Sequence, residues 1–163
     1  MANAQADYNQ ALHYLTLVHD RKPKIDWFAS FIESWLGLTT YGLGQHDLTR
    51  QHLVSGLRYQ GQYFSVSLSL AALLCNQAGN PKRAASLLAL AFNTEKFSLL
   101  GGLLYDYSLA LRLKDELAAV LPPDVFAAVW EEGQALDLEV TYPQLAQELS
   151  QPGWGDELIA TPG

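Results

Sequence analysis

The sequence predicts an all-α fold in which about eight helices pair as antiparallel hairpins. Three observations support this prediction. Apolar residues recur at helical spacing along most of the chain, as Tyr8, Leu12 and Leu15 do near its start. Glycine and proline separate the periodic segments and supply helix ends. The spacing of glycine and small residues around one turn recurs 35 residues further along, as expected for stacked helix pairs.

The first helix is predicted over residues 8–20, because Arg21 and Lys22 are favourable cations at a helix end and Pro23 stops the helix. A second helix is predicted from Ile25 or Asp26 to the glycines at 42–44. The remaining helices are predicted, in order, at residues 47–59, 62–78, 81–93, 98–120, 123–133 and 142–150.

Proline and glycine mark the later helix ends. Gly79 closes the fourth helix, and Pro81 occupies the first position of the fifth. Val66 to Leu70 alternates like a strand, but the apolar run continues without a turn signal, which favours a buried helix. Residues 151–163 are predicted to be an irregular tail, in which Trp154 and Leu158 either dock on the body or fray.

Small residues recur around two turn glycines. Gly44 and Gly79 each precede, by five residues, a small side chain in the next helix. The small residues at matching offsets are Gly37 and Ala72, Thr49 and Ala84, and Gly56 and Ala91. Antiparallel helices approach closely only where facing side chains are small, and the turn needs a residue that tolerates positive φ. This spacing resembles the tetratricopeptide repeat, a helix–turn–helix of about 34 residues.

The second repeat fits this pattern better than the first. In the first repeat Glu33 stands where an aromatic residue is usual, and Thr49 replaces alanine. The segment from Asp7 to Ala11 resembles the second helix of a repeat whose first helix is missing, as in an excised domain. We therefore expect one tetratricopeptide-like solenoid over residues 1–150, with residues 97–150 as its C-terminal cap.

The C-terminal third carries a second resemblance. Leu99 and Gly101 open a long helix, a Leu121-Pro-Pro break follows, and Phe126, Val129, Trp130 and Gly133 form one apolar helix face. From Phe97 to Leu149 this resembles the end of the helical-repeat region in bacterial ATP-dependent transcriptional regulators, of LuxR type or NB-ARC type. The resemblance implies a regulatory sensor or scaffold region. Here the segment before Phe126 is short and Tyr142-Pro143 is expected to interrupt the last helix, so we expect an abbreviated cap.

The amino-acid composition excludes several classes of function. Charged residues make up only 17% of the chain, so apolar surface is left for a partner, another domain or a second copy. The net charge of −7 and the scattered basic residues argue against direct nucleic-acid binding. No apolar run is long enough to span a membrane. The single cysteine, Cys75, cannot form an internal disulfide, and a cytoplasmic location fits best.

No catalytic, metal or cofactor site is predicted. The four histidines lack metal-ligand spacing and are interpreted as surface or capping residues: His13, His19, His46 and His52. Cys75 is interpreted as a buried packing residue. Glu131 and Glu132 are adjacent on a helix and point apart, which favours a solvated face over a general acid/base pair. The glycines lack any phosphate-binding motif.

A binding groove is the one functional site that the repeat register predicts. Its candidate residues are Phe31, Ser34, Leu38, Tyr41, Ser69, Leu73, Asn76, Gln77, Asp106 and Tyr107. Their mixture of apolar and amide side chains suits a peptide or a small apolar ligand. The alternative is that several of them pack in the core.

The predicted function is therefore non-enzymatic. It is protein–protein interaction or signal sensing, with a protein or peptide, or the adjoining ATPase and DNA-binding domains, as partner. The alternative is a self-associating structural module, a homodimer without a ligand.

Overall fold

The protein is all-α. A computed structural model describes residues 2–21, 24–59, 65–93 and 104–154, and within these residues there are eight α-helices and no strand. The helices are α1 (Ala2–His19), α2 (Asp26–Gly42), α3 (His46–Leu57), α4 (Ser65–Gln77), α5 (Pro81–Asn93), α7 (Leu104–Val120), α8 (Pro123–Gln134) and α9 (Leu138–Leu149). The predicted all-α class is confirmed, and the tetratricopeptide-like solenoid arrangement stays a prediction.

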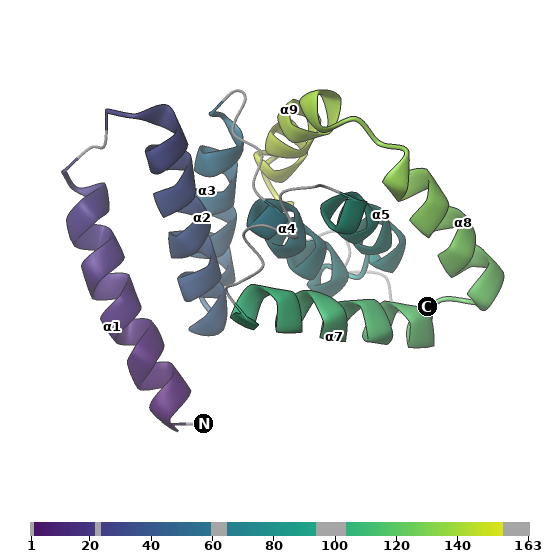
Figure 1. Cartoon of the computed structure of the whole chain (residues 1–163), viewed down its shortest axis with the longest axis horizontal. Helices are drawn as coiled ribbons and strands as arrows, with labels where there is room; N and C mark the ends of the chain where they lie inside the picture. The colour runs from purple at the N-terminus through teal and green to yellow at the C-terminus, as the bar shows by residue number, and fades with distance from the viewer. Residues whose placement is uncertain (1, 22–23, 60–64, 94–103, 155–163) are drawn as a thin grey trace.

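Two helix hairpins form the middle of the molecule. α2 pairs with α3, and α4 pairs with α5. Figure 1 shows α4 and α5 in the centre, with α2 and α3 on one side, α7 below, α8 on the opposite side and α9 above. α1 lies on the outer side of α2, at the edge of the molecule.

The C-terminal helices turn back over the hairpins. α8 packs against α5, and α9 packs against α3. Arg83 on α5 also pairs with Glu148 on α9, with 2.9 Å between Nη2 and Oε2. The predicted cap region therefore covers the sides of earlier helices, and this return of α9 to α3 was not predicted. Trp154 packs against the apolar core, whereas Leu158 lies outside the described residues.

The two hairpin turns have the same geometry. Gly44 and Gly79 have φ of 73° and 78°, which favours glycine. At the first turn, the amides of Gly44 and Gln45 donate to the carbonyls of Tyr41 and Thr40, at 2.9 Å each. At the second turn, the amides of Gly79 and Asn80 donate to Asn76 and Cys75, at 3.1 and 2.9 Å. Both turns are Schellman helix ends, related by the 35-residue spacing.

The apolar core centres on α4 and α5. Every residue from Val66 to Cys75 is buried, so α4 is covered on all sides, as its uninterrupted apolar run predicts. The predicted small packing residues Gly37, Gly56, Ala72, Ala84 and Ala91 are all buried.

α8 and α5 approach each other closely at Gly133. A Cβ atom added at Gly133 would come within 2.4 Å of the carbonyl oxygen of Ser86 and 2.8 Å of the Ala89 Cβ. No larger residue fits there without moving α8 away. The packing role predicted for Gly133 is therefore confirmed.

The last helix begins earlier than predicted and is not interrupted. The Asp137 side chain accepts a 2.7 Å hydrogen bond from the Glu139 amide, which starts α9 before Tyr142. Pro143 lies inside α9, although proline removes one helical hydrogen bond. Tyr142, Leu145 and Leu149 are buried on the same face, and their burial offsets that loss. The expected interruption at Tyr142-Pro143 is therefore wrong.

Candidate functional site

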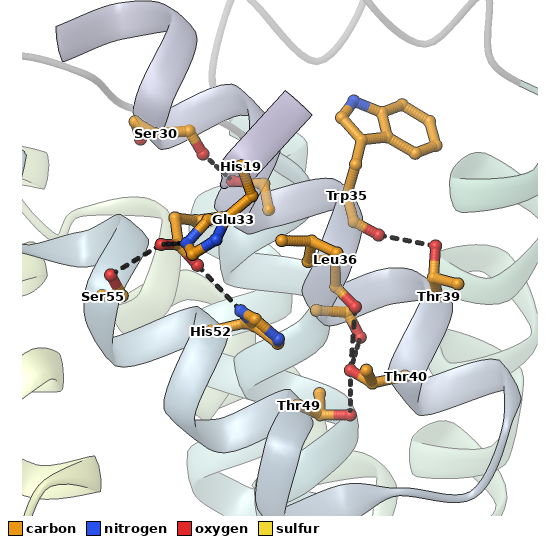
Figure 2. Close-up of polar contacts among 12 residues, drawn as sticks. His19, Ser30, Glu33, Trp35, Leu36, Thr39, Thr40, Thr49, His52 and Ser55 are labelled. Atoms are coloured by element: carbon orange, nitrogen blue, oxygen red, sulfur yellow. Dashed lines mark hydrogen bonds and ion pairs between the residues drawn. The ribbon is translucent and has the colours of Figure 1, made fainter. Parts of the chain in front are cut away.

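A buried carboxylate joins the first three helices. Glu33 on α2 is only 5% exposed. Its Oε1 accepts hydrogen bonds from His19 Nε2 on α1, at 3.0 Å, and from Ser55 Oγ on α3, at 2.9 Å. Its Oε2 accepts from His52 Nδ1 on α3, at 2.8 Å. Figure 2 shows these side chains converging on Glu33, which we call the Glu33 cluster.

The surroundings of Glu33 favour its charged form. Burial alone would raise the pKa of Glu33, but hydrogen bonds from His52 and Ser55 and the charges of His52 and His19 outweigh burial. The net result is a pKa below the ordinary value of 4.5. An ionised carboxylate therefore lies between three helices, where each of its hydrogen bonds is charge-assisted.

The Glu33 cluster lacks the geometry of a hydrolytic triad. In such a triad the imidazole takes the serine proton while the carboxylate orients the imidazole. Here Ser55 donates directly to Glu33, so the hydroxyl is bonded to the carboxylate and not to His52. Among the described residues no group of three or more His, Cys, Asp or Glu side chains could hold a metal ion. The arrangement can hold the three helices together, and protonation of Glu33 at low pH would weaken it.

The sequence-based interpretation of His19 and His52 missed this cluster. Both were interpreted as surface or capping residues, whereas both bond to Glu33. Glu33 itself is the feature of the sequence that could have predicted the cluster. It replaces an aromatic residue at a packing position, and a buried carboxylate needs hydrogen-bond partners. His13 and His46 are exposed, as predicted, and lie beside Tyr14 and Tyr41.

The predicted groove residues separate into a buried set and a surface set. Ser34, Leu38, Ser69 and Leu73 are buried, so they present almost no surface to a ligand in this conformation. Phe31, Tyr41 and Asn76 are partly exposed, and Gln77 is exposed. The side chains of Asp106 and Tyr107 lie outside the described residues.

The physical reason for the buried set is close packing between the two hairpins. The Ser34 hydroxyl lies 3.0 Å from that of Ser67 on α4 and donates to the carbonyl of Ser30. Leu38 and Leu73 belong to the apolar core. These residues therefore follow the alternative reading, in which they pack between helices.

The surface set continues an aromatic series on α2. The ring centroids of Phe28 and Phe31 are 6.5 Å apart and nearly parallel, and those of Phe31 and Trp35 are 5.9 Å apart. Trp27, at the start of α2, is 52% exposed and contacts Phe28 edge to face at 5.6 Å. Figure 2 shows Trp35 pointing away from the Glu33 cluster, so the two faces of α2 carry different chemistry. We call Trp27, Phe28, Phe31 and Trp35 the aromatic series.

A polar contact lies at the other end of α2. Gln77 Nε2 donates to the Tyr41 hydroxyl at 3.1 Å, which links the ends of α2 and α4. Burial and the negative charge of Glu116 on α7 raise the pKa of Tyr41, so the phenol stays protonated at neutral pH. The Tyr41 end of α2 therefore contacts α4 and feels the charge of Glu116 on α7.

The aromatic residues of the predicted cap serve packing. Phe126 and Trp130 on α8 have ring centroids 5.3 Å apart, and Trp130 lies 5.8 Å from Phe92 on α5. Lys114 Nζ on α7 lies 4.8 Å from the Trp130 centroid and 5.6 Å from the Phe92 centroid. This cation–π contact ties α7 to the α5–α8 pair.

Two further predictions of inert residues agree with the described structure. Glu131 and Glu132 on α8 are exposed, as expected for a solvated face. Cys75 is buried, and burial, with the nearby charge of Glu148, raises its pKa to about 12. A thiol with such a pKa is a poor nucleophile at neutral pH, in agreement with a packing role.

Comparison with known proteins gives no assignment. No protein-family model, no curated protein and no solved structure matches the sequence significantly. In the part of the chain that the structure describes, no helix has the combined length and apolar character needed to cross a bilayer.

Proposed function

We propose that this chain is a non-enzymatic interaction or signal-sensing domain of the cytoplasm that binds a protein or peptide partner through the aromatic series on α2. The aromatic series carries the proposal. Four aromatic side chains in succession, one of them 52% exposed, form an apolar surface on a chain that has little charge. Aromatic side chains contribute most of the binding energy in many protein interfaces.

The polar contact near the end of α2 supplies groups that can orient a bound peptide on this surface. Tyr41 and Gln77 offer a hydroxyl and an amide, which can bond the backbone of an extended peptide. Apolar anchors with a few placed polar groups are typical of specific binding sites.

The proposed mechanism uses the packing between hairpins. A partner that contacts α2 and α4 together favours one relative tilt of the two hairpins over others. In a regulator that carries an ATPase module beside this domain, the change in tilt would alter the contacts with that module. The link to bacterial ATP-dependent transcriptional regulators is supported by the resemblance of residues 97–149. It predicts that partner binding changes the ATPase rate of a protein that carries both parts.

The binding proposal is tested by selecting peptides from a displayed random library against the purified chain. Peptides are then measured against Trp27→Ala and Phe31→Ala variants and against Val120→Ala, an exposed apolar control on α7. We expect the aromatic variants to weaken binding at least tenfold, since truncating an interface anchor costs about 2 kcal/mol or more, and the control to bind normally. Peptides that bind all variants equally, or a selection that yields none, would refute the proposal.

Self-association is the second candidate, because α1 has an outer apolar face. Tyr14 and Leu17 on α1 are 59% and 48% exposed, and α1 packs mainly against α2. Docking of this face on a second copy would cover it. Sedimentation of the chain over a wide concentration range separates the two candidates. A dimer that Tyr14→Ser dissociates would favour self-association, and a monomer throughout would favour the partner-binding proposal.

A further inference from the structure

A cleft with two arginines lies between α3 and the end of α9. Its volume is about 330 Å³, at the lower end of the range for small-molecule sites. The lining residues are Arg50, Gln51, Val54, Ser55, Arg58, Leu149 and Ser150. The lining residues from α3 and its C-cap stand at positions 50, 51, 54, 55 and 58, so they lie on one face of the helix.

The cleft is positively charged although the chain carries a net charge of −7. No Asp or Glu lines it. Arg50 Nη1 donates to the carbonyl oxygen of Leu149 at 2.8 Å, and a neutral carbonyl does not cancel the guanidinium charge. The carbonyl end of α9 carries about half a negative charge, well below the two positive charges of the arginines. The side chain of Arg58 is exposed and has no hydrogen-bond or ion-pair partner among the described residues.

The Glu33 cluster lies directly behind the cleft. Ser55 lines the cleft while its hydroxyl donates to Glu33 Oε1. The Glu33 carboxylate is buried and also accepts hydrogen bonds from His19 and His52. Its negative charge is therefore stabilised inside the protein and does not face the cleft. The cleft surface itself therefore presents guanidinium groups, the Gln51 amide and the apolar side chain of Val54, since Leu149 is completely buried.

We propose that this cleft binds an oxyanion, the phosphate or carboxylate group of a small molecule. The planar guanidinium group pairs with two oxygens of such a group at once. Arg50 is held in place by Leu149 before any ligand arrives, which lowers the entropic cost of binding. Val54 gives the carbon part of the ligand an apolar surface. The site lies on α3 and α9, apart from the aromatic series, and does not rest on the proposed function.

Titration of the full chain with sodium phosphate tests this site. Sodium chloride keeps the ionic strength constant, and backbone amide resonances of residues 50–58 and 149–150 report binding. We expect saturable shifts at these residues. Arg58→Gln should weaken phosphate binding about tenfold, because charge-assisted hydrogen bonds are lost. Arg21→Gln is the matched control, since it removes the same charge from an exposed residue outside the cleft.

The same titration with sodium acetate distinguishes the two ligand groups. Saturation with phosphate alone would identify a phosphate site, and saturation with acetate alone a carboxylate site. The proposal is overturned if neither anion saturates, or if Arg21→Gln and Arg58→Gln weaken binding equally, because diffuse charge would then explain the effect.

Discussion

The α2–α3 and α4–α5 hairpins share one backbone plan and differ in what fills the space between their helices. Their turns have the same hydrogen bonds and the same positive-φ glycine. Their interiors differ at positions 35 residues apart. Four polar residues of the first hairpin correspond to apolar residues of the second. Each polar residue followed by its counterpart, these pairs are Glu33 and Leu68, His52 and Leu87, Ser55 and Leu90, and Thr49 and Ala84.

The two interiors are filled in different ways. In the first, Glu33 accepts three hydrogen bonds, and the hydroxyl oxygens of Thr40 and Thr49 lie 3.0 Å apart. In the second, Leu68 and Leu87 are completely buried among apolar neighbours. Ser69 on α4 is also buried, and its hydroxyl has no hydrogen-bond partner among the described residues. The comparison teaches that the hairpin geometry accepts either chemistry, and that the buried carboxylate of the first hairpin is surrounded by hydrogen-bond donors.

The difference also decides how each hairpin attaches to its surroundings. The carboxylate of Glu33 reaches outward to His19, and so attaches α1 by a directional hydrogen bond. The second hairpin attaches α8 by close contact at Gly133, where shape alone makes the fit. The attachment of α1 depends on the protonation state of Glu33, whereas the attachment of α8 at Gly133 involves no titratable group.

The largest expected effect comes from placing the charge of the first hairpin in the second. Leu68→Glu would bury a carboxylate in the apolar core that also contains Leu87 and Leu90, the counterparts of His52 and Ser55, and leucine cannot donate a hydrogen bond. We expect a loss of about 4 kcal/mol or more in the free energy of unfolding. Denaturant unfolding followed by far-UV circular dichroism measures it. Leu68→Met, similar in volume, should cost less than about 1.5 kcal/mol. Equal stability of the two variants would contradict the idea that the partners decide which chemistry a hairpin tolerates.

A smaller effect is expected from converting the first hairpin toward the second. Glu33→Leu leaves His52 and Ser55 without their acceptor, and His52→Leu leaves a buried carboxylate with one donor fewer. Each change should cost about 2 kcal/mol. The double variant should cost clearly less than the sum, because a buried polar pair can be replaced by apolar side chains at little cost. Additive losses in the same unfolding measurement would show that the two residues do not act as a pair.

Local signals in the sequence were sufficient for most of the fold. Gly44, Gly79, Pro81 and Pro123 mark helix ends through backbone preferences that need no tertiary context. For this reason α5 was predicted with its observed ends, and the 35-residue spacing identified matching turns. The path of α9 was not predictable in the same way. Burial of Tyr142 and Leu145 against the body carries the helix through Pro143, and that burial depends on distant residues.

The candidate site was less predictable because its parts lie far apart in the chain. His19 and His52 have no meaningful spacing in sequence, and only the packing of α1 and α3 on α2 brings them to Glu33. Of the residues that the repeat register assigns to a groove, Phe31 and Tyr41 are partly exposed, and their role in binding stays a prediction. The repeat register could not predict that Ser34 would be covered, since this depends on how closely the second hairpin approaches.

The smallest expected effect is a difference in acid sensitivity. The pKa of Glu33 lies below its ordinary value of 4.5, so the unfolded chain binds this proton at a higher pH than the folded chain does. The stability that Glu33 contributes is therefore present above about pH 4.5 and is lost as the pH falls through the lower, folded-state pKa. Since α4–α5 has Leu68 at the matching position, only the first hairpin carries this dependence.

Glu33→Gln should therefore flatten the decline of the unfolding free energy between about pH 5 and about pH 3. Denaturant unfolding at several pH values measures the slope, and every other carboxylate contributes equally to both proteins. Glu132→Gln, at an exposed position on α8, is the control and should keep the wild-type slope. Parallel curves for Glu33→Gln and the wild type would mean that the hydrogen bonds to Glu33 do not favour its ionised form. The acid sensitivity of the first hairpin would then not come from Glu33, and the two hairpins would not differ in this respect.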